Sequence, residues 1–456
     1  MARSRAIVLI AEGVETSLVA RWGPERLPNF HRLFAEGAGG LMHSEFVPYE
    51  PSGLFTAFTG VEPATHGCFS YWEVHTPDYV PRVLDSGDSR RPFLWHRPEL
   101  GDRTVAVINV FGTHPVQPVN GHVISYPMRS TLHACHPRDL PIQLAEVGIK
   151  PVHDVTVWFA GQPKSERVPL ILGADEQRAA AALHLLRGGL GTPPDLTIVN
   201  MTAIDRLSHF YWQELEPGSQ VAEDDQAIFQ AYQLCDRLLG ELLDLVDGST
   251  SLFCFSEIGF GPLRSYQSVN DVLAKAGLLT YAADGVIDFT RTRAFEAVQG
   301  AAGVNLNLVG RQRDGVVTGA EYDSVLAEVR AVLTEYVNPL TGRLFLADAI
   351  PRDKIHTGPA IEEAPDLIME PADWRYLAFG DMYWVSRVTR WLQSGWHRRD
   401  SFWGGVGPAF VPGSGGAGSL TDVMPTIAQM LDLPAFADTS GTPLGHAPGG
   451  PAPTWR

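Results

Sequence analysis

The chain of 456 residues has few cysteines. The four that it has are Cys68, Cys135, Cys235 and Cys254. They show neither CxxC spacing nor the density of a disulfide scaffold, so a fold held by disulfides is excluded. Cys254 stands inside an apolar run that is typical of a buried strand, where a cysteine packs as ordinary core.

Basic residues are also scarce. Lys and Arg number 35 against 52 Asp and Glu, which gives a formal charge of -17. This balance argues against nucleic acid or an anionic membrane as the main partner. An anionic substrate, which we expect to be a small molecule, would therefore need local positive charge, most simply from metal ions.

Long apolar runs are missing as well. None approaches the roughly 18 residues of a membrane span. The first run is interrupted by Glu12 after about six residues, which is shorter than the core of a signal peptide. These features predict a cytoplasmic protein with no membrane association.

Three short apolar runs are each followed by a carboxylate. The runs cover residues 6–11, 196–201 and 251–256, and the carboxylates are Glu12, Asp205 and Glu257. Such runs are typical of buried parallel strands, and open parallel sheets place their chemistry at the strand ends. The three carboxylates are therefore predicted to converge, with His209 one helical turn after Asp205. This arrangement indicates a metal centre.

Strands and helices alternate along the chain, which predicts a layered α/β fold with a mostly parallel sheet. Helices are expected in LPNFHRLFAEGAGG, with Pro28 in the first turn and glycines ending it, and at 224–246, 268–279 and 322–336. Further strands are expected at 104–111, 155–159, 304–309 and 366–369. We expect a discontinuous core at 1–261 and 394–446, a cap-like insertion at 262–393, and a disordered tail at 447–456.

Six strings, in order, resemble the alkaline phosphatase superfamily, most closely its branch of type I phosphodiesterases, nucleotide pyrophosphatases and phosphohydrolases or phosphomutases. The strings are LPNFHRLFAEGAGG, FTAFTGVEPATHG, TAIDRLSHFYW, FSEIGFGPL, SGWHRRDSF and LTDVMPTIAQML. The resemblance covers nearly the whole chain. It implies an α/β/α core and two metals, usually zinc, around a Thr or Ser nucleophile.

One of these metals is matched here. The resemblance assigns its ligands to Asp205, His209 and His397, a carboxylate and two imidazoles that leave room for water or substrate, as at a catalytic Zn²⁺ site. The second metal position departs from the family pattern and holds Glu12, Glu50, Glu257 and Ile258. The nucleophile position falls on Glu50, and Ser52 is the nearest hydroxyl.

Two interpretations of the second position remain open. In one, the site has decayed to a mononuclear or empty pocket. In the other, Glu12, Glu50 and Glu257 join the three matched ligands in a remodelled centre, although each Asp-to-Glu change moves a carboxylate by about 1.5 Å. Three changes that all retain a carboxylate favour the second interpretation. Its oxygen-rich donor set suits Mn²⁺, Mg²⁺ or Fe²⁺.

The leading hypothesis is metal-assisted cleavage or transfer of a phosphate ester, phosphodiester or sulfate ester. A metal-bound hydroxide would attack, with Glu50 as general base or ligand and inversion at phosphorus. A covalent route through Ser52 would give retention, and Glu50 could also form an acyl phosphate. The alternatives are a non-hydrolytic metalloenzyme, catalysing elimination, isomerisation or an oxygen-dependent step, and a binding protein without catalysis.

Several other residues have both a functional and an ordinary interpretation. Asn109 and His114 could line the substrate pocket, although turn hydrogen bonds are favoured, and Asp400 could orient His397. His66, His133, His136 and His356 are better explained as structural or surface residues. Tyr383, Trp384 and Trp396 fit an apolar pocket wall and ordinary core equally well.

Overall fold

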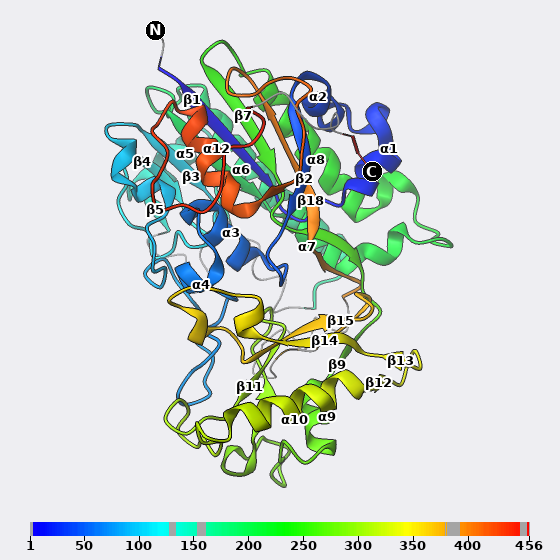
Figure 1. The fold of residues 1–456 in the computed structure, drawn as a ribbon. Coiled ribbons are helices and arrows are strands. Elements are labelled where there is room, and N and C mark those ends of the chain that lie inside the picture. The colour runs from blue at the N-terminus through cyan, green and yellow to red at the C-terminus, as the bar shows by residue number, and fades with distance from the viewer. Residues whose placement is uncertain are drawn as a thin grey trace. The chain divides into compact units, whose positions relative to one another are not determined.

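The three apolar runs become adjacent strands at the centre of a nine-stranded sheet in the computed structural model (Figure 1). Strand β1 (Arg5–Ala11) lies between β6 (Leu196–Met201) and β7 (Thr250–Phe255) and is parallel to both. Their carboxyl ends therefore meet at one edge, as predicted. The structure describes residues 3–126, 134–152, 161–378, 380, 393–446 and 454–455.

Most of the remaining strands extend this parallel arrangement. The sheet order is β19-β2-β18-β7-β1-β6-β3-β4-β5. The further strands are β2 (Ala38–His43), β3 (Val105–Ile108), β4 (Gly121–Ile124), β5 (Cys135–His136), β18 (Asp400–Val406) and β19 (Gly418–Ser419). Strand β18 is antiparallel to both of its neighbours, and β5 is antiparallel to β4. The predicted α/β fold with a mostly parallel sheet is confirmed.

Helices cover the sheet on both faces. Ile7, Leu9 and Ala11 alternate along β1 and enter one apolar cluster with the helices of one face. Those helices are α1 (Thr16–Arg26), α2 (Pro28–Glu36), α5 (Leu140–Glu146), α6 (Lys164–Leu186), α7 (Ala203–Tyr211) and α8 (Ala227–Leu243). The other residues of β1 point to the opposite face. There α12 (Val423–Met430) contacts β1 and β7 and packs on α3 (Glu50–Thr59).

The boundaries of the predicted elements have local causes. Pro28 is the first residue of α2, where its missing N–H costs nothing. Helix α8 begins later than predicted because residues 223–225 form a separate 3-10 turn. Strand β3 ends earlier than predicted because Asn109 takes a left-handed conformation, with φ at 60°.

The chain divides into two units, the first containing this sheet and comprising residues 1–61, 85–261 and 388–456. The second comprises 62–84 and 262–387, so it includes a short segment that the sequence analysis placed in the core. The predicted strand at 155–159, His133, Tyr383 and Trp384 lie outside the described residues, as does most of the predicted tail.

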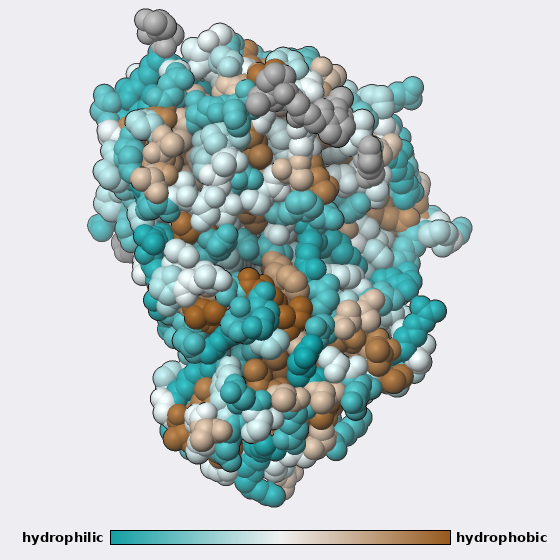
Figure 2. Space-filling model, in the orientation of Figure 1, coloured by the Kyte–Doolittle hydropathy of each residue, from teal (hydrophilic) through white to brown (hydrophobic). Residues whose placement is uncertain are grey.

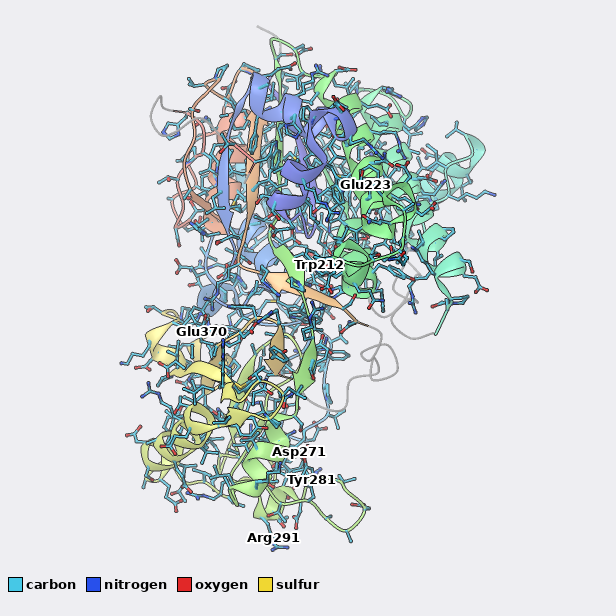
Figure 3. The ribbon with its side chains drawn as sticks, turned by 90° about the vertical axis from the view of Figure 1, so that its right-hand side faces the viewer. Trp212, Glu223, Asp271, Tyr281, Arg291 and Glu370 are labelled. Carbon is cyan, nitrogen blue, oxygen red and sulfur yellow. The ribbon has the colours of Figure 1, made fainter. Side chains whose placement is uncertain are left out.

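An antiparallel sheet organises the second unit. Its order is β10-β11-β15-β14. The predicted strands at 304–309 and 366–369 are β11 and β15, and the predicted helices are α9 and α10. The elements of this unit are α4 (Pro63–His66), β9 (Ser265–Gln267), α9 (Val269–Lys275), β10 (Ala294–Glu296), β11 (Gly303–Leu306), α10 (Tyr322–Glu335), β12 (Val337–Asn338), β13 (Arg343–Leu344), β14 (Leu346–Pro351), β15 (Leu367–Pro371) and β16 (Tyr376–Ala378). Tyr281 donates a hydrogen bond of 3.1 Å to Asp271 of α9 (Figure 3).

The face drawn in Figure 2 is mostly hydrophilic, with apolar residues in small groups. One such group lies over the β12–β13 hairpin, where Val337, Leu340 and Leu344 are exposed. Within the described ranges, no helix has both the length and the apolar composition to cross a membrane.

Candidate metal centre

Helix α7 presents Asp205 and His209 on one face. It follows β6 directly, and all nine of its residues are buried. Residues four apart on a helix lie one above the other, so both side chains point the same way. The backbone N–H of Asp205 also donates to the carbonyl of Glu12 at 3.1 Å, which fixes the start of α7 to the end of β1.

The amino end of α7 is held by Asp175 of α6. Its carboxylate accepts hydrogen bonds from the backbone N–H groups of Thr202 and Ala203 at 3.2 and 2.7 Å. Arg178 donates to the same carboxylate at 2.5 Å and to the Thr202 hydroxyl at 2.7 Å. The buried carboxylate of Asp175 thus satisfies free N–H groups at the start of α7, the helix that carries Asp205 and His209.

Gly13 leaves the room that α7 needs beside β1. Its φ is +85°, and a Cβ atom there would lie 2.9 Å from the Cα of Asp205. Any other residue at this position would be strained and would push Asp205 away.

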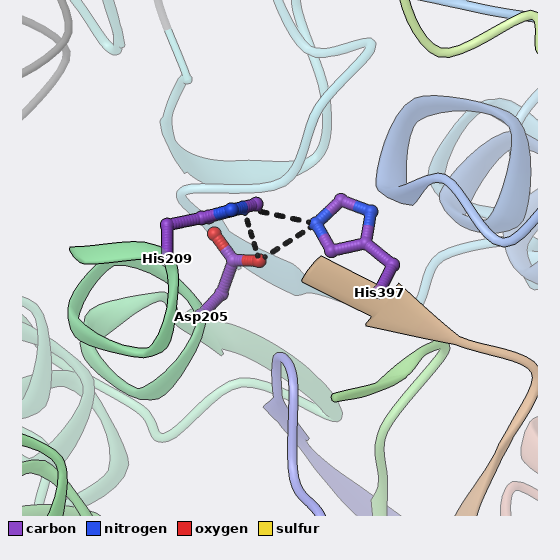
Figure 4. Close-up of side chains that lie close together, drawn as sticks. All are labelled: Asp205, His209 and His397. Carbon is purple, nitrogen blue, oxygen red and sulfur yellow. Dashed lines mark hydrogen bonds and ion pairs between the residues drawn. The ribbon is translucent and has the colours of Figure 1, made fainter. Parts of the chain in front are cut away.

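His397 completes the cluster from a distant part of the chain. It lies on β17 (Gly395–Arg398), which pairs with β8 (Gly259–Pro262). Its Nε2 is 3.1 Å from Oδ1 of Asp205 and 3.1 Å from Nε2 of His209 (Figure 4). The remaining separation, from Nε2 of His209 to Oδ1 of Asp205, is 3.3 Å. All three side chains are buried.

The outer nitrogen of each imidazole faces a backbone carbonyl. Nδ1 of His209 is 3.3 Å from the oxygen of Gly395, and Nδ1 of His397 is 3.1 Å from that of Pro48. A carbonyl only accepts, so in the Nδ1–H tautomer each ring donates to its carbonyl and leaves Nε2 free to bind a metal ion. Burial lowers the pKa of His209 to about 4, so its ring is neutral near pH 7. Two imidazole Nε2 atoms and a carboxylate oxygen thus meet in one place.

This donor set fits a divalent cation. Tetrahedral Zn²⁺ with bonds of about 2.0–2.1 Å separates its ligand atoms by about 3.3 Å, and here the separations are 3.1 to 3.3 Å. Burial alone would raise the pKa of Asp205, but His209, His397 and Arg206 hold it well below its ordinary value. The carboxylate is therefore ionised and ready to bind a metal.

Three glutamates gather beside this group. Glu12 follows β1, and its Oε2 accepts from the Asn200 amide at 2.7 Å. Glu257 follows β7, is fully buried, and at neither oxygen accepts a hydrogen bond from any other residue in the described part of the chain. Glu50 is the first residue of α3, and its Oε2 is 3.9 Å from Nδ1 of His397. Burial, together with the other carboxylates, raises the pKa of Glu12 and of Glu257 well above the ordinary value.

The glutamates do not join the donor atoms of the other three residues. Across the described part of the chain, Asp205, His209 and His397 form the only group of ligand atoms that all lie within 4.8 Å of one another. Glu50 approaches His397 at Nδ1, the nitrogen that points away from the group. The assignment of Glu12, Glu50 and Glu257 as ligands stays a prediction.

Arg206, which was not predicted as a site residue, is buried beside Asp205. Its Nη1 is 2.6 Å from Oδ2 of Asp205, and its Nη2 donates to the Tyr126 hydroxyl at 2.8 Å. Asn200, which donates to Glu12, was not predicted either. Asn200 carried a signal, because it is a polar residue inside a run that is predicted to be a buried strand.

The structure places the other predicted site residues in different settings. Ser52 is buried in the first turn of α3. Asn109 donates to the backbone oxygen of Asn200 at 3.2 Å, a bond from the end of β3 to β6 and not within a turn, and its place in a substrate pocket stays a prediction. The backbone oxygen of His114, which lies in the loop after β3, accepts a hydrogen bond from the backbone N–H of Ser86. Trp396 contacts His209 edge to face, with ring centres 4.8 Å apart.

The expectation that Asp400 orients His397 is wrong. Asp400 is exposed and bonds to Nδ1 of His43 at 2.8 Å. Nδ1 of His397 faces the Pro48 carbonyl instead. Residues an odd number apart on an extended segment point to opposite sides, which separates the two side chains.

The other histidines outside the centre have local roles or settings. His66, in the second unit, accepts from the backbone N–H of Cys68 at 3.1 Å. His356, in the same unit, packs against Phe69, with ring centres 5.1 Å apart. His136 lies on the short edge strand β5.

The fold and the donor set together define an α/β protein with an Asp/His/His group at its strand ends that could hold a metal ion. Residues 6–397 match the type I phosphodiesterase/nucleotide pyrophosphatase family, and the chain belongs to that family. The resemblance found in the sequence is thereby confirmed. The family is one of phosphodiesterases and pyrophosphatases, which are hydrolases of phosphate esters.

Solved structures with the same fold include an ectonucleotide pyrophosphatase/phosphodiesterase 5 from mouse and one from human. The murine protein, in an inactive form in complex with AMP, has a TM-score of 0.58 at 13% identity, covering 96% of this chain and 98% of that one. The human protein has a TM-score of 0.56 at 14% identity, covering 96% and 97%.

A curated relative is described as a probable serine protease from Lysobacter enzymogenes. It is 25% identical over 181 residues, which is 37% of this chain. The match spans 28% of that relative's length.

Proposed function

We propose that the chain is a metal-dependent hydrolase that cleaves a phosphate ester or phosphodiester of a small anionic metabolite. The observation that carries this proposal is the convergence of Asp205, His209 and His397, whose donor atoms are 3.1 to 3.3 Å apart. A divalent ion bound there would supply Lewis-acid polarisation and offset the charge of the phosphoryl group.

The chain's own residues supply positioning and proton transfer. The carbonyls of Gly395 and Pro48 hold the two imidazoles in the tautomer that leaves Nε2 free. Glu50, at the start of α3, stands where the resembling family carries its hydroxyl nucleophile. We assign it the role of general base, taking a proton from the attacking water. Direct attack by water inverts the configuration at phosphorus.

A covalent route through Ser52 ranks lower. Ser52 lies in the same first turn of α3 and is buried. Attack by its hydroxyl followed by water would give two displacements and net retention. Stereochemistry at phosphorus therefore separates the two routes.

The test is an activity screen on protein purified without chelators. It would use aryl phosphate monoesters, aryl phosphodiesters, aryl sulfates and nucleotides, since the murine protein of the same fold was solved with AMP. We expect phosphate ester hydrolysis that EDTA abolishes and Zn²⁺ or Mn²⁺ restores. H397A should lose it, while H43A, at an exposed position, should retain it. Hydrolysis that survives both EDTA and H397A would refute the proposal.

A non-hydrolytic metalloenzyme is the second candidate. It is favoured by the presence of Glu50, a carboxylate, where the family's hydroxyl nucleophile is expected. Iron in the purified protein, with no hydrolysis of any ester in the screen, would support this reaction class over the first.

We also propose a cytoplasmic location. All four cysteines are free, as is usual in a reducing compartment. Fractionation of expressing cells, followed by detection of the full-length chain, tests the location directly.

A further inference from the structure

Arg206 lies between the candidate metal ligands and the glutamates. Its Nη1 is 2.6 Å from Oδ2 of Asp205 and 3.7 Å from Oε1 of Glu12. Its side chain is only 2% exposed. The Tyr126 hydroxyl holds Nη2 at 2.8 Å, so the guanidinium is fixed in place.

Asp205 uses its two oxygens in the way a bridging carboxylate does. Oδ1 faces the two imidazoles, and Oδ2 bonds to the guanidinium. In a two-metal site the ions lie about 3.5–4 Å apart, and a bridging carboxylate gives one oxygen to each. Arg206 therefore occupies the side of Asp205 where a second ion would bind.

From this position we infer that Arg206 takes the place of a second metal ion, so that the centre holds one divalent cation and one guanidinium. The inference rests on the proposed function for its first ion. A guanidinium does not lose its proton and donates hydrogen bonds without acting as a ligand. It supplies permanent positive charge to Glu12 and repels a further cation from the same space.

The surrounding charges agree with a single ion. Glu12, Glu50, Asp205 and Glu257 are buried. One guanidinium and one dication offset three of the four negative charges of these carboxylates. Among the residues that the structure describes, no other residue donates a hydrogen bond to either oxygen of Glu257, so both remain available to a second ion.

The test is metal stoichiometry by elemental mass spectrometry, after saturation with Zn²⁺ or Mn²⁺ and gel filtration. We expect one equivalent in the wild-type chain, one in E257Q, and none in H397A. Two equivalents in the wild type, with one lost in E257Q, would overturn the inference while leaving the metal-dependent function in place. No metal in the wild type would refute both the inference and the proposed metal site.

Removing the charge of Arg206 gives a second, independent test. R206M keeps most of the side-chain volume without the charge, and we expect it to bind a second equivalent. R206K keeps the charge and should stay at one equivalent. A folded R206M, judged by circular dichroism, that still binds one equivalent would overturn the inference. If R206M does not fold, the comparison of wild type with E257Q and H397A decides.

Discussion

Nε2 of His209 and Nε2 of His397 lie 3.1 Å apart, and both face Oδ1 of Asp205. The outer nitrogen of each ring faces a backbone carbonyl, which can hold the Nδ1–H tautomer. In that tautomer the two inner nitrogens present lone pairs, which a bound cation would bring into attraction. The proposed metal ion would therefore hold the two rings and the carboxylate together.

Metal binding should therefore stabilise the chain. A ligand at 100 times its Kd adds about 2.7 kcal/mol to the free energy of unfolding, which corresponds to a rise in Tm of about 4 °C for a unit as large as the first. Thermal unfolding with EDTA and with excess Zn²⁺ measures this difference. H397A should show no Zn²⁺-dependent rise, and an equal rise in H397A would mean that the ion binds elsewhere.

Glu50 and Ser52 should differ sharply in their effect on activity. Loss of a general base costs about 10² to 10⁴ in rate, so E50Q should lower kcat by that factor. S52A should leave kcat close to the wild-type value. A chiral phosphorothioate substrate should give an inverted product, and retention together with an inactive S52A would assign attack to the serine instead.

Gly13 and Gly148 form a matched pair for testing the position of Asp205. Their φ angles are +85° and +82°, but only Gly13 has atoms within 4 Å of an added Cβ, the nearest being the Cα of Asp205 at 2.9 Å. Alanine at either position costs about 1–2 kcal/mol from the left-handed backbone. G13A should in addition weaken Zn²⁺ binding, by about 10- to 100-fold if it acts as loss of a supporting contact does.

Isothermal titration with Zn²⁺ measures the two affinities. Equal affinities for G13A and G148A would show that α7 tolerates displacement at this point without effect on the site.

Asp175 should matter more for stability than its position outside the centre suggests. D175N leaves Arg178 buried without its charge partner and weakens the bonds to the start of α7, which should cost about 3–5 kcal/mol. E176Q, at the exposed neighbouring position, should change the free energy of unfolding by less than about 0.5 kcal/mol. Urea denaturation of both variants gives the comparison, and similar midpoints would contradict the role of Asp175.

Two histidines with lowered pKa values should make the second unit sensitive to acid. Burial lowers the pKa of His66 to about 3, with a further contribution from His356, and burial lowers the pKa of His356 to about 4. Both values lie below the unfolded value of about 6.5, so the unfolded chain binds more protons. Their effect on stability is absent above pH 6.5, and as the pH falls from there toward 4 the free energy of unfolding declines by about 1.4 kcal/mol per pH unit for each residue.

Urea denaturation between pH 7.5 and 5 should show this decline. The double variant H66Q/H356Q should have a flatter pH dependence, and an unchanged slope would show that neither residue is responsible.

The sequence predicted the centre of the sheet well because the signals there were local. Strands β1, β6 and β7 are continuous apolar runs, and α2 begins at the proline that marks it. Asp205, His209 and His397 were predicted to lie together, and their ligand atoms do so in the structure. Asp205 and His209 share one helix face, and a family string marked His397.

Strand β18 and the buried ion pair between Arg206 and Asp205 were not predicted. Strand β18 contains Gly404 and Gly405, which are poor strand residues. The reason for them is tertiary, since a Cβ on Gly405 would lie 2.4 Å from the ring of Phe410. Arg206 reads as a surface residue in its helix, and its bond to Asp205 shows only once β1 and α7 are in place.

The location of β18 has a consequence for how the protein is made. This strand lies between β2 and β7, yet it comes from residues 400–406, with His397 just before it. During synthesis, most strands of the sheet are therefore made before β18, the strand that fills the position between β2 and β7. At that stage the chain has only two of the three candidate ligands. A nascent chain stalled before residue 397 would have Asp205 and His209 without His397, and should bind the proposed ion poorly.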